Sequence, residues 1–121
     1  FLAKINHNGK NYLIGSNGKF ILNENYNIDL PFIFGKPNVN EFLKLKKIIE
    51  ESKLSYNQIK NFYFFQSKRW DLRLKDDILL RLPSKLTNKT LDQLQEFLEN
   101  YDGDNFFSLD ARIENQIILN E

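Results

Sequence analysis

The chain has 121 residues, of which 41% are hydrophobic and 27% are charged, the composition of a globular domain rather than of a disordered tail. Its net charge of +1 excludes a general electrostatic attraction to nucleic acid or anionic lipid, and the lack of cysteine excludes disulfides and thiolate metal sites. No apolar run approaches the roughly 20 residues of a membrane-spanning helix. The length predicts one domain, residues 1–121. Because the sequence begins with Phe1 rather than methionine, we expect this domain to be part of a longer protein.

Two Asn-Gly pairs predict three short strands joined as a meander at the start of the chain. Asn-Gly between apolar stretches is the strongest short signal for a β-hairpin, and the two pairs occupy residues 8–9 and 17–18. The turns predict that Ala3 pairs with Ile14, Ile5 with Tyr12, Leu13 with Leu22 and Ile14 with Ile21.

A break and then an amphipathic helix are predicted next. Two prolines and a glycine interrupt any regular element within residues 30–37, which we interpret as a segment that crosses out of the N-terminal part, residues 1–35. Asn38 has the position of an N-cap, with Glu41 at the capping-box spacing. The apolar stripe of this helix comprises Phe42, Leu45, Ile48 and Ile49.

Residues 59–82 have strand character, and their second half predicts a hairpin with a three-residue loop at residues 75–77. A two-residue loop would place a leucine opposite an arginine, whereas the three-residue loop aligns only apolar residues on one face. This register places Asp71 opposite Arg81 on a solvent-exposed face and requires Asp77 to be left-handed, which aspartate tolerates. The inward pairs are Leu74 with Ile78, Leu72 with Leu80 and Trp70 with Leu82.

A second amphipathic helix is predicted after the proline at position 83. Thr90 can cap it, Gln93 can return the hydrogen bond, and Gly103 is available to end it. Its buried stripe comprises Leu91, Leu94, Phe97 and Leu98.

The closing segment predicts a last hairpin with its turn at residues 114–115. A two-residue loop aligns Ile118 with Ala111 and leaves Ile117 and Leu119 on the outer face, with Asp110 and Arg112. An outer apolar face on an edge strand is covered by a neighbouring helix or by missing residues, or it accepts a strand from a partner, and the pattern alone leaves these alternatives open. The inward residues are Phe107, Leu109, Ala111 and Ile113.

These elements together predict an α+β fold. The sheet is expected to be mostly antiparallel, a meander plus hairpins, with two amphipathic helices packed against it. Residues 36–121 then form a helix-hairpin-helix-hairpin unit after the N-terminal part.

The residues that could support catalysis or metal binding have structural explanations. His7 is the only histidine and lies beside a turn without a partner for acid-base work. The acidic residues at 76–77 and 102–104 lack the ligand spacing of a calcium loop and are interpreted as turn residues. Because no phosphate loop, nucleophile elbow or zinc spacing occurs either, we predict a protein that is not an enzyme and that binds no cofactor or metal.

An alternative function is suggested by the aromatic and basic residues at 60–75. Sheets that bind single-stranded nucleic acid combine exposed aromatic rings with basic residues. Here Trp70 lies in the apolar register and acidic residues balance the basic ones, so a core strand is favoured and no nucleic-acid partner is predicted. A single-stranded nucleic-acid-binding module remains the alternative.

Four motifs occur in order along the chain: GKNYLIGSNGKFI at 9–21, LPFIFG at 30–35, RWDLRLKDDILLRLP at 69–83 and SLDARIENQIILN at 108–120. In this order they resemble the C-terminal β domain of the bacterial cell-division proteins FtsQ and DivIB. The chain departs from that family's pattern at Asp77, where glycine is usual, at Ala111, where a larger apolar residue is usual, and at Ile113, where an aromatic residue is common.

The resemblance implies a non-enzymatic scaffold of the cell-division complex, the divisome, that binds FtsB and FtsL. It implies an upstream transmembrane helix and POTRA domain, which place this domain on the periplasmic side of the inner membrane. The last strand would receive a strand from FtsB, which would also cover the outer apolar face, and Ile117→Lys is expected to weaken that binding. Carried over by position, the contact residues are Arg112, Ile113, Glu114, Asn115, Gln116, Ile117 and Leu119.

Overall fold

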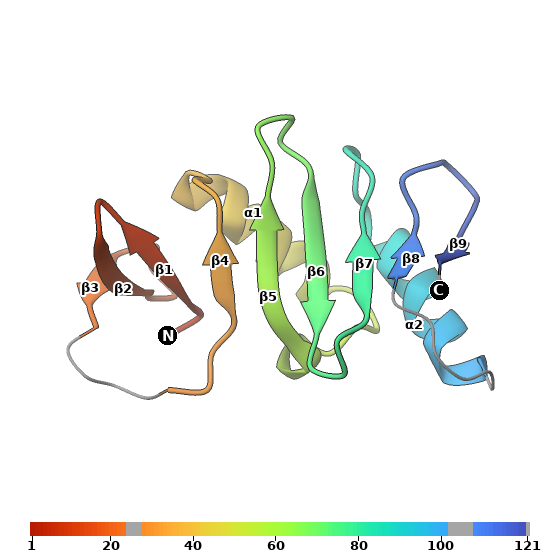
Figure 1. Ribbon diagram of the computed structural model, residues 1–121, viewed down its shortest axis with the longest axis horizontal. Coiled ribbons are helices and arrows are strands. Elements are labelled where there is room, and N and C mark those ends of the chain that lie inside the picture. The colour runs from red at the N-terminus through yellow and green to blue at the C-terminus, as the bar shows by residue number, and fades with distance from the viewer. Residues whose placement is uncertain (24–27, 102–107, 121) are drawn as a thin grey trace.

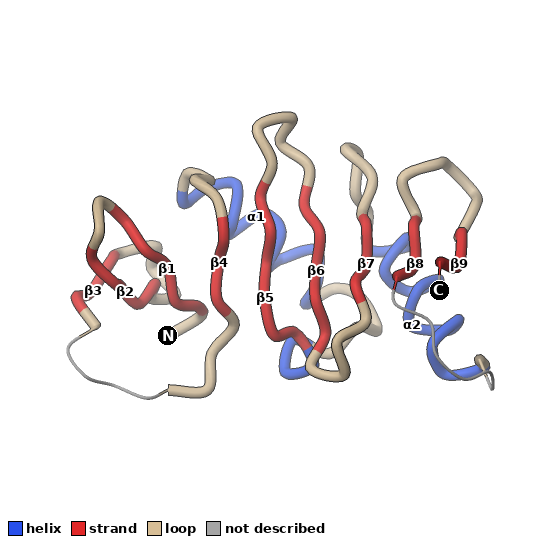
Figure 2. The backbone as a smooth tube through the Cα atoms, in the orientation of Figure 1, coloured by secondary structure: helices blue, strands red, loops and turns tan. Residues whose placement is uncertain are grey.

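The computed structural model describes residues 1–23, 28–101 and 108–120, which form a nine-stranded sheet with two helices on one of its faces (Figures 1 and 2). The helices are α1 (Val39–Glu50) and α2 (Asn88–Asn100), with a 3-10 turn at Tyr56–Gln58. The strands are β1 (Ala3–His7), β2 (Lys10–Ile14), β3 (Phe20–Leu22), β4 (Phe32–Phe34), β5 (Ile59–Phe64), β6 (Trp70–Leu74), β7 (Leu79–Arg81), β8 (Ser108–Asp110) and β9 (Ile118–Asn120). Their order across the sheet is β3-β2-β1-β4-β5-β6-β7-β8-β9.

The fold is α+β as predicted, but the sheet is mixed rather than mostly antiparallel. β4 lies between β1 and β5 and runs parallel to both, and β8 runs parallel to β7. Residues 30–37, expected to cross without regular structure, therefore contain a central strand. The sequence did not reveal it because parallel partners come from distant parts of the chain and leave no hairpin signal.

The N-terminal hairpins show one correct register and one error. β1 and β2 pair as predicted across the first Asn-Gly turn. In the second hairpin Leu13 pairs with Ile21, one residue away from the predicted alignment. Gly15 N–H donates to the Lys19 carbonyl over 2.9 Å, so the loop has three residues, 16–18, instead of the predicted two. Its last residue, Gly18, is left-handed, with a φ of 80°.

Helix α1 begins at the predicted cap. Asn38 Oδ1 accepts the Glu41 N–H over 2.8 Å, which satisfies one of the free donors at the helix start. Asn38→Ala is expected to lower the free energy of unfolding by about 1 kcal/mol, measured by urea denaturation. Asn40→Ala makes the same change at an exposed position inside the first turn and is the control. An equal loss in both variants would contradict the capping role.

Helix α2 begins earlier than predicted. Its N-cap is Thr87, whose side chain makes no capping hydrogen bond, so the expectation that Thr90 caps the helix with Gln93 was wrong. Leu91 and Leu94 are buried as predicted. Gly103, expected to end the helix, lies outside the described residues.

The core lies between the sheet and the two helices, and the β6–β7 hairpin supplies much of it. Leu72 pairs with Leu80 and Asp77 has a φ of 68°, which confirms the three-residue loop and its left-handed residue. Trp70 and Leu82 are joined by a backbone hydrogen bond of 3.2 Å at the far end of the same ladder. Large side chains with less than 2% exposure include Phe42, Phe62, Leu72, Leu80, Leu82, Leu91 and Leu94.

Candidate partner-binding edge

Strand β9 lies at one edge of the sheet, as predicted for the second strand of the closing hairpin. Only β8 pairs with it among the described residues, so its outer side faces no other strand. Figure 1 shows β9 beside the C-terminus, with α2 behind this end of the sheet. The other edge is β3, which is equally short.

Backbone hydrogen bonding shows which groups of β9 are free. Ala111 N–H donates to the Arg81 carbonyl over 2.9 Å, so the backbone groups of the alternate residue Asp110 point toward β9. Asp110 is opposite Ile118, and in an antiparallel ladder such a pair exchanges both hydrogen bonds. The N–H and C=O of Leu119, one residue on, therefore point away from the sheet at the free edge.

The register of this hairpin differs from the prediction by one residue. Ile118 is opposite Asp110 rather than Ala111, and Leu119 is opposite Leu109. A one-residue shift moves each side chain of a strand to the other face. Leu119 consequently packs against the core, and Ile118, predicted to point inward, is 40% exposed.

The wide loop between the two strands explains the shift. Gln116 N–H donates to the Ile113 carbonyl over 3.1 Å, so the turn is at residues 114–115 as predicted. Of the two turn residues, only Asn115 has a positive φ, of 61°. A type I′ turn, which continues a two-residue hairpin, needs two such residues. The backbone pairing of the hairpin therefore begins only at Ile118, the first residue of β9.

The seven predicted contact residues fall into two groups. Residues 112–116 form an exposed loop, in which Ile113, predicted to face inward, is 53% exposed. Ile117 and Leu119 are half-buried against the core. Ile118 lies between them and was not among the predicted contacts. Phe107, also predicted to face inward, is outside the described residues.

A groove of about 510 Å³ runs along this loop. Its other wall is the segment that joins β7 to the first turn of α2. The groove is basic, because its charged lining residues are three basic side chains, Lys85, Lys89 and Arg112, and one acidic side chain, Glu114. Ile113 adds an exposed apolar side chain to its rim.

Two buried aspartates lie on the sheet face that the helices leave open. Asp71 is opposite Arg81 as predicted, but it is 4% exposed rather than solvent-exposed, because Arg69 pairs with it from the same strand end. Asp110 is 8% exposed and pairs with Arg112 in bidentate geometry, with Nε–Oδ1 and Nη2–Oδ2 distances of 2.9 and 2.6 Å.

The hydrogen bonds from Arg112 lower the pKa of Asp110 below its ordinary value of 3.8. A carboxyl whose pKa is depressed on folding stabilises the fold above the unfolded pKa, and this stability is lost as the pH falls through the folded pKa. Asp110→Asn is therefore expected to be less stable than the wild type at pH 6, with a difference that shrinks below about pH 4. Urea unfolding at each pH measures it. The control is Glu114→Gln, at an exposed position of the adjacent loop, and a pH dependence that matches that of Asp110→Asn would contradict the assignment.

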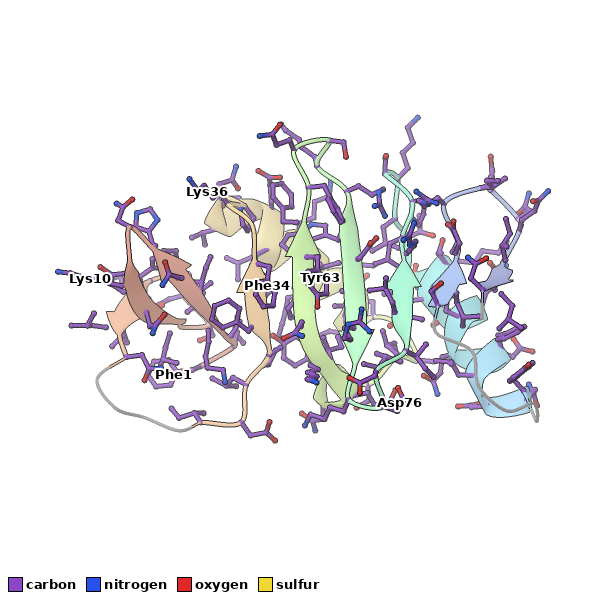
Figure 3. All side chains as sticks on the ribbon, viewed as in Figure 1. Phe1, Lys10, Phe34, Lys36, Tyr63 and Asp76 are labelled. Atoms are coloured by element: carbon purple, nitrogen blue, oxygen red, sulfur yellow. The ribbon has the colours of Figure 1, made fainter. Side chains whose placement is uncertain are left out.

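Aromatic side chains also gather on the open face. Phe34 is 46% exposed and stacks on Tyr63 with ring centroids 5.1 Å apart, at the centre of the sheet in Figure 3. Arg73 Nε donates to the Tyr63 hydroxyl over 3.4 Å. Phe62 and Trp70 are buried on the other face, so the interpretation of residues 60–75 as core strand holds for these two rings.

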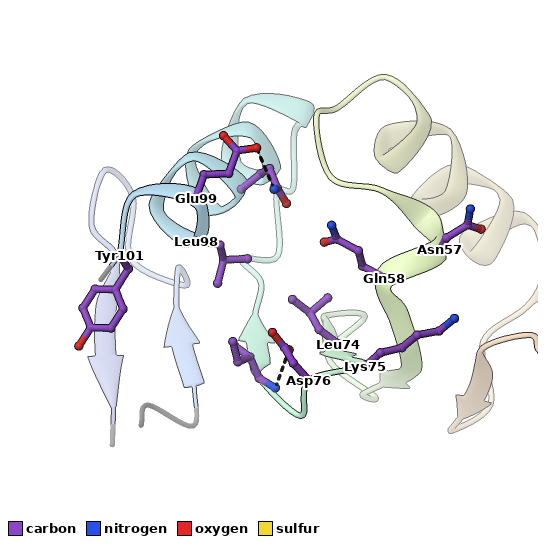
Figure 4. A pocket seen from close by; sticks show the side chains of 10 residues that line it. Asn57, Gln58, Leu74, Lys75, Asp76, Leu98, Glu99 and Tyr101 are labelled. Carbon is purple, nitrogen blue, oxygen red and sulfur yellow. Dashed lines mark hydrogen bonds between the residues drawn. The ribbon is translucent and has the colours of Figure 1, made fainter. Parts of the chain in front are cut away.

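The remaining features of the described residues include no assembled catalytic group. A hollow of about 580 Å³ between α2 and the β6–β7 turn is lined by dispersed polar residues, among them Gln58, Lys75 and Glu99 (Figure 4). Asp76 accepts the Ile78 N–H over 3.3 Å, as a turn aspartate does. No three His, Asp or Glu side chains in the described ranges are placed to hold a metal ion. The predicted acidic turn at 102–104 lies outside them.

Comparison with known families identifies the chain. The model of a family described as cell division protein FtsQ/DivIB, C-terminal, matches residues 3–115, from β1 to the turn before β9. A comparison with curated proteins gave no match. Neither helix within the described part of the chain is long and apolar enough to cross a membrane. The family is one of non-catalytic cell-division scaffolds whose partners are divisome proteins and whose C-terminal domain is extracytoplasmic. The chain therefore belongs to the FtsQ/DivIB family and represents its C-terminal domain.

Proposed function

We propose that this domain is a divisome scaffold that binds FtsB, together with FtsL, by accepting a strand at β9. The observation that carries the proposal is the outer edge of β9, which no other described strand covers and where the Leu119 N–H and C=O point outward beside the exposed Ile118. Main-chain hydrogen bonds at such an edge supply affinity, and alternate side chains supply specificity. The proposed contacts are Arg112, Ile113, Glu114, Asn115, Gln116, Ile117 and Leu119, with Ile118 added by its exposure.

The proposed setting is a protein of the inner membrane, held by one transmembrane helix upstream of this domain. The domain would then lie in the periplasm or its extracytoplasmic equivalent, where the extracytoplasmic parts of FtsB and FtsL are accessible. The family context supports this setting. No second function is proposed, because two rings of the aromatic stretch, Phe62 and Trp70, are core residues.

Ile118→Lys tests the docking face directly. The substitution is expected to weaken binding of a synthetic peptide from the extracytoplasmic end of the cognate FtsB about fivefold or more, because a buried apolar contact is replaced by a charge. The domain should stay folded, since the side chain is 40% exposed. Calorimetric titration measures the affinity.

The control for that titration is Ile21→Lys. Ile21 is 48% exposed on β3, at the opposite edge of the sheet, and receives the same chemical change. Equal affinities for the wild type and Ile118→Lys would remove this face from the interface. Protection of the Leu119 amide from exchange without any peptide would instead mean that other residues of the protein cover the edge.

A further inference from the structure

All four arginines of the chain lie around β6, β7 and β8 on the open face of the sheet. Lysines outnumber them and are spread along the chain. Arginine has a planar, weakly hydrated fork that suits carboxylate recognition better than the ammonium of lysine. Because the arginines are concentrated on one face of the sheet, that face is a candidate surface for binding carboxylates. The four arginines are Arg69, Arg73, Arg81 and Arg112.

Three of the arginines have partners within the domain. Arg69 pairs with Asp71 and also donates to the Leu82 carbonyl, and its guanidinium lies 4.6 Å from the ring of Phe65. Arg112 holds Asp110. Arg73 donates through Nη1 to the backbone carbonyl of the residue at position 77 over 2.8 Å.

Arg81 is the exception. The register places it between Asp71 in β6 and Asp110 in β8, yet each aspartate is already held by a different arginine. Within the described ranges Arg81 makes no hydrogen bond or ion pair through its side chain, and its Nε is buried without a partner. An unsatisfied buried donor is costly, more so on a charged group. Arg81 interacts with Asp110 only through its charge, which helps to lower the pKa of that carboxyl. Three guanidiniums thus share two carboxylates, and one positive charge is in excess.

We propose that Arg81 binds a carboxylate of an acidic segment that belongs to the partner of β9. The inference rests on the proposed function and adds the chemistry of the partner to it. Arg81, Asp110 and Ile118 form one row on the open face, so Arg81 lies two strands, roughly 10 Å, from the exposed edge residue. A partner segment that covers Ile118 and continues over the sheet would reach it.

The flanking charges favour a single carboxylate over a polyanion. The cluster of Arg69, Arg81 and Arg112 with Asp71 and Asp110 carries one excess positive charge, and both aspartates are buried beside Arg81. A nucleic acid brings a series of phosphates, which the two fixed carboxylates would repel. One acidic side chain completes the alternation of charge without adding repulsion.

The test uses the domain and the FtsB peptide described above, with peptide versions in which each acidic residue is replaced in turn by its amide. One amide version is expected to bind the wild-type domain about tenfold more weakly, the loss of one charge-assisted hydrogen-bonded pair. Arg81→Gln should bind the unmodified peptide about tenfold more weakly and should no longer distinguish that amide version. The affinities of the peptide versions for the wild-type domain remain a valid test even if Arg81→Gln is unstable.

Lys10→Gln is the control, because it makes the same charge change on β2 at the far end of the sheet (Figure 3) and should leave the affinity unchanged. Equal binding of all amide versions, or an Arg81→Gln domain that still distinguishes them, would overturn the inference and leave strand addition intact. No saturable binding of the unmodified peptide would overturn both proposals.

Discussion

Gly35→Ala is expected to destabilise the domain by about 3 kcal/mol or more, a large part of the stability of a domain of this size. Gly35 follows β4 with a φ of 101°, a conformation that residues with a side chain rarely adopt. A Cβ at this position would lie 2.4 Å from the Phe64 carbonyl oxygen and 3.1 Å from Phe64 Cβ. Because the oxygen belongs to the backbone of β5, it can move only by disturbing the β4–β5 ladder.

Gly9→Ala separates the steric effect from the conformational one. Gly9 also has a positive φ, of 80°, but a Cβ there would meet nothing within 4 Å. The substitution should therefore cost only the left-handed conformation, about 1–2 kcal/mol. Urea denaturation of both variants measures the difference. Equal losses would contradict the close approach of β4 and β5, and with it the reason for glycine in the LPFIFG motif.

Leu119→Pro is expected to weaken binding of the FtsB peptide about a hundredfold or more. Proline lacks an N–H, and the Leu119 N–H is the donor that points to the free edge. In the free domain β9 is an edge strand, where proline is tolerated. Once a partner strand is added β9 becomes an interior strand, where proline is not tolerated.

Leu119→Ala is the matched control for that change. It removes the same apolar packing of the half-buried side chain but keeps the N–H. Binding should fall only slightly, while both variants should lose some stability toward urea. If the alanine variant binds as weakly as the proline variant, the side chain rather than the backbone edge would be responsible.

Elements defined by neighbouring residues were predictable from the sequence. The β1–β2 and β6–β7 registers follow from turn chemistry and from apolar residues that must share a face. The start of α1 follows from the cap at Asn38. β4 was not predictable in this way, because its partners β1 and β5 are parallel strands from distant parts of the chain.

The candidate edge was predictable in place but not in orientation. β9 lies at an edge of the sheet, as the interpretation of the closing hairpin predicted. The wide loop with its single left-handed residue, Asn115, shifted the register by one and exchanged the faces of Ile118 and Leu119. The surplus charge at Arg81 depends on contacts across three strands, which sequence spacing does not encode.

Amide hydrogen exchange of β9, with and without the FtsB peptide, tests strand addition most directly. In the free domain the amides of Ile118 and Asn120 should exchange slowly, because they are bonded to β8, and the amide of Leu119 should exchange fast. Saturating peptide should slow exchange at Leu119 by bonding its outward N–H. Peptide that binds while Leu119 continues to exchange fast would contradict strand addition at this edge.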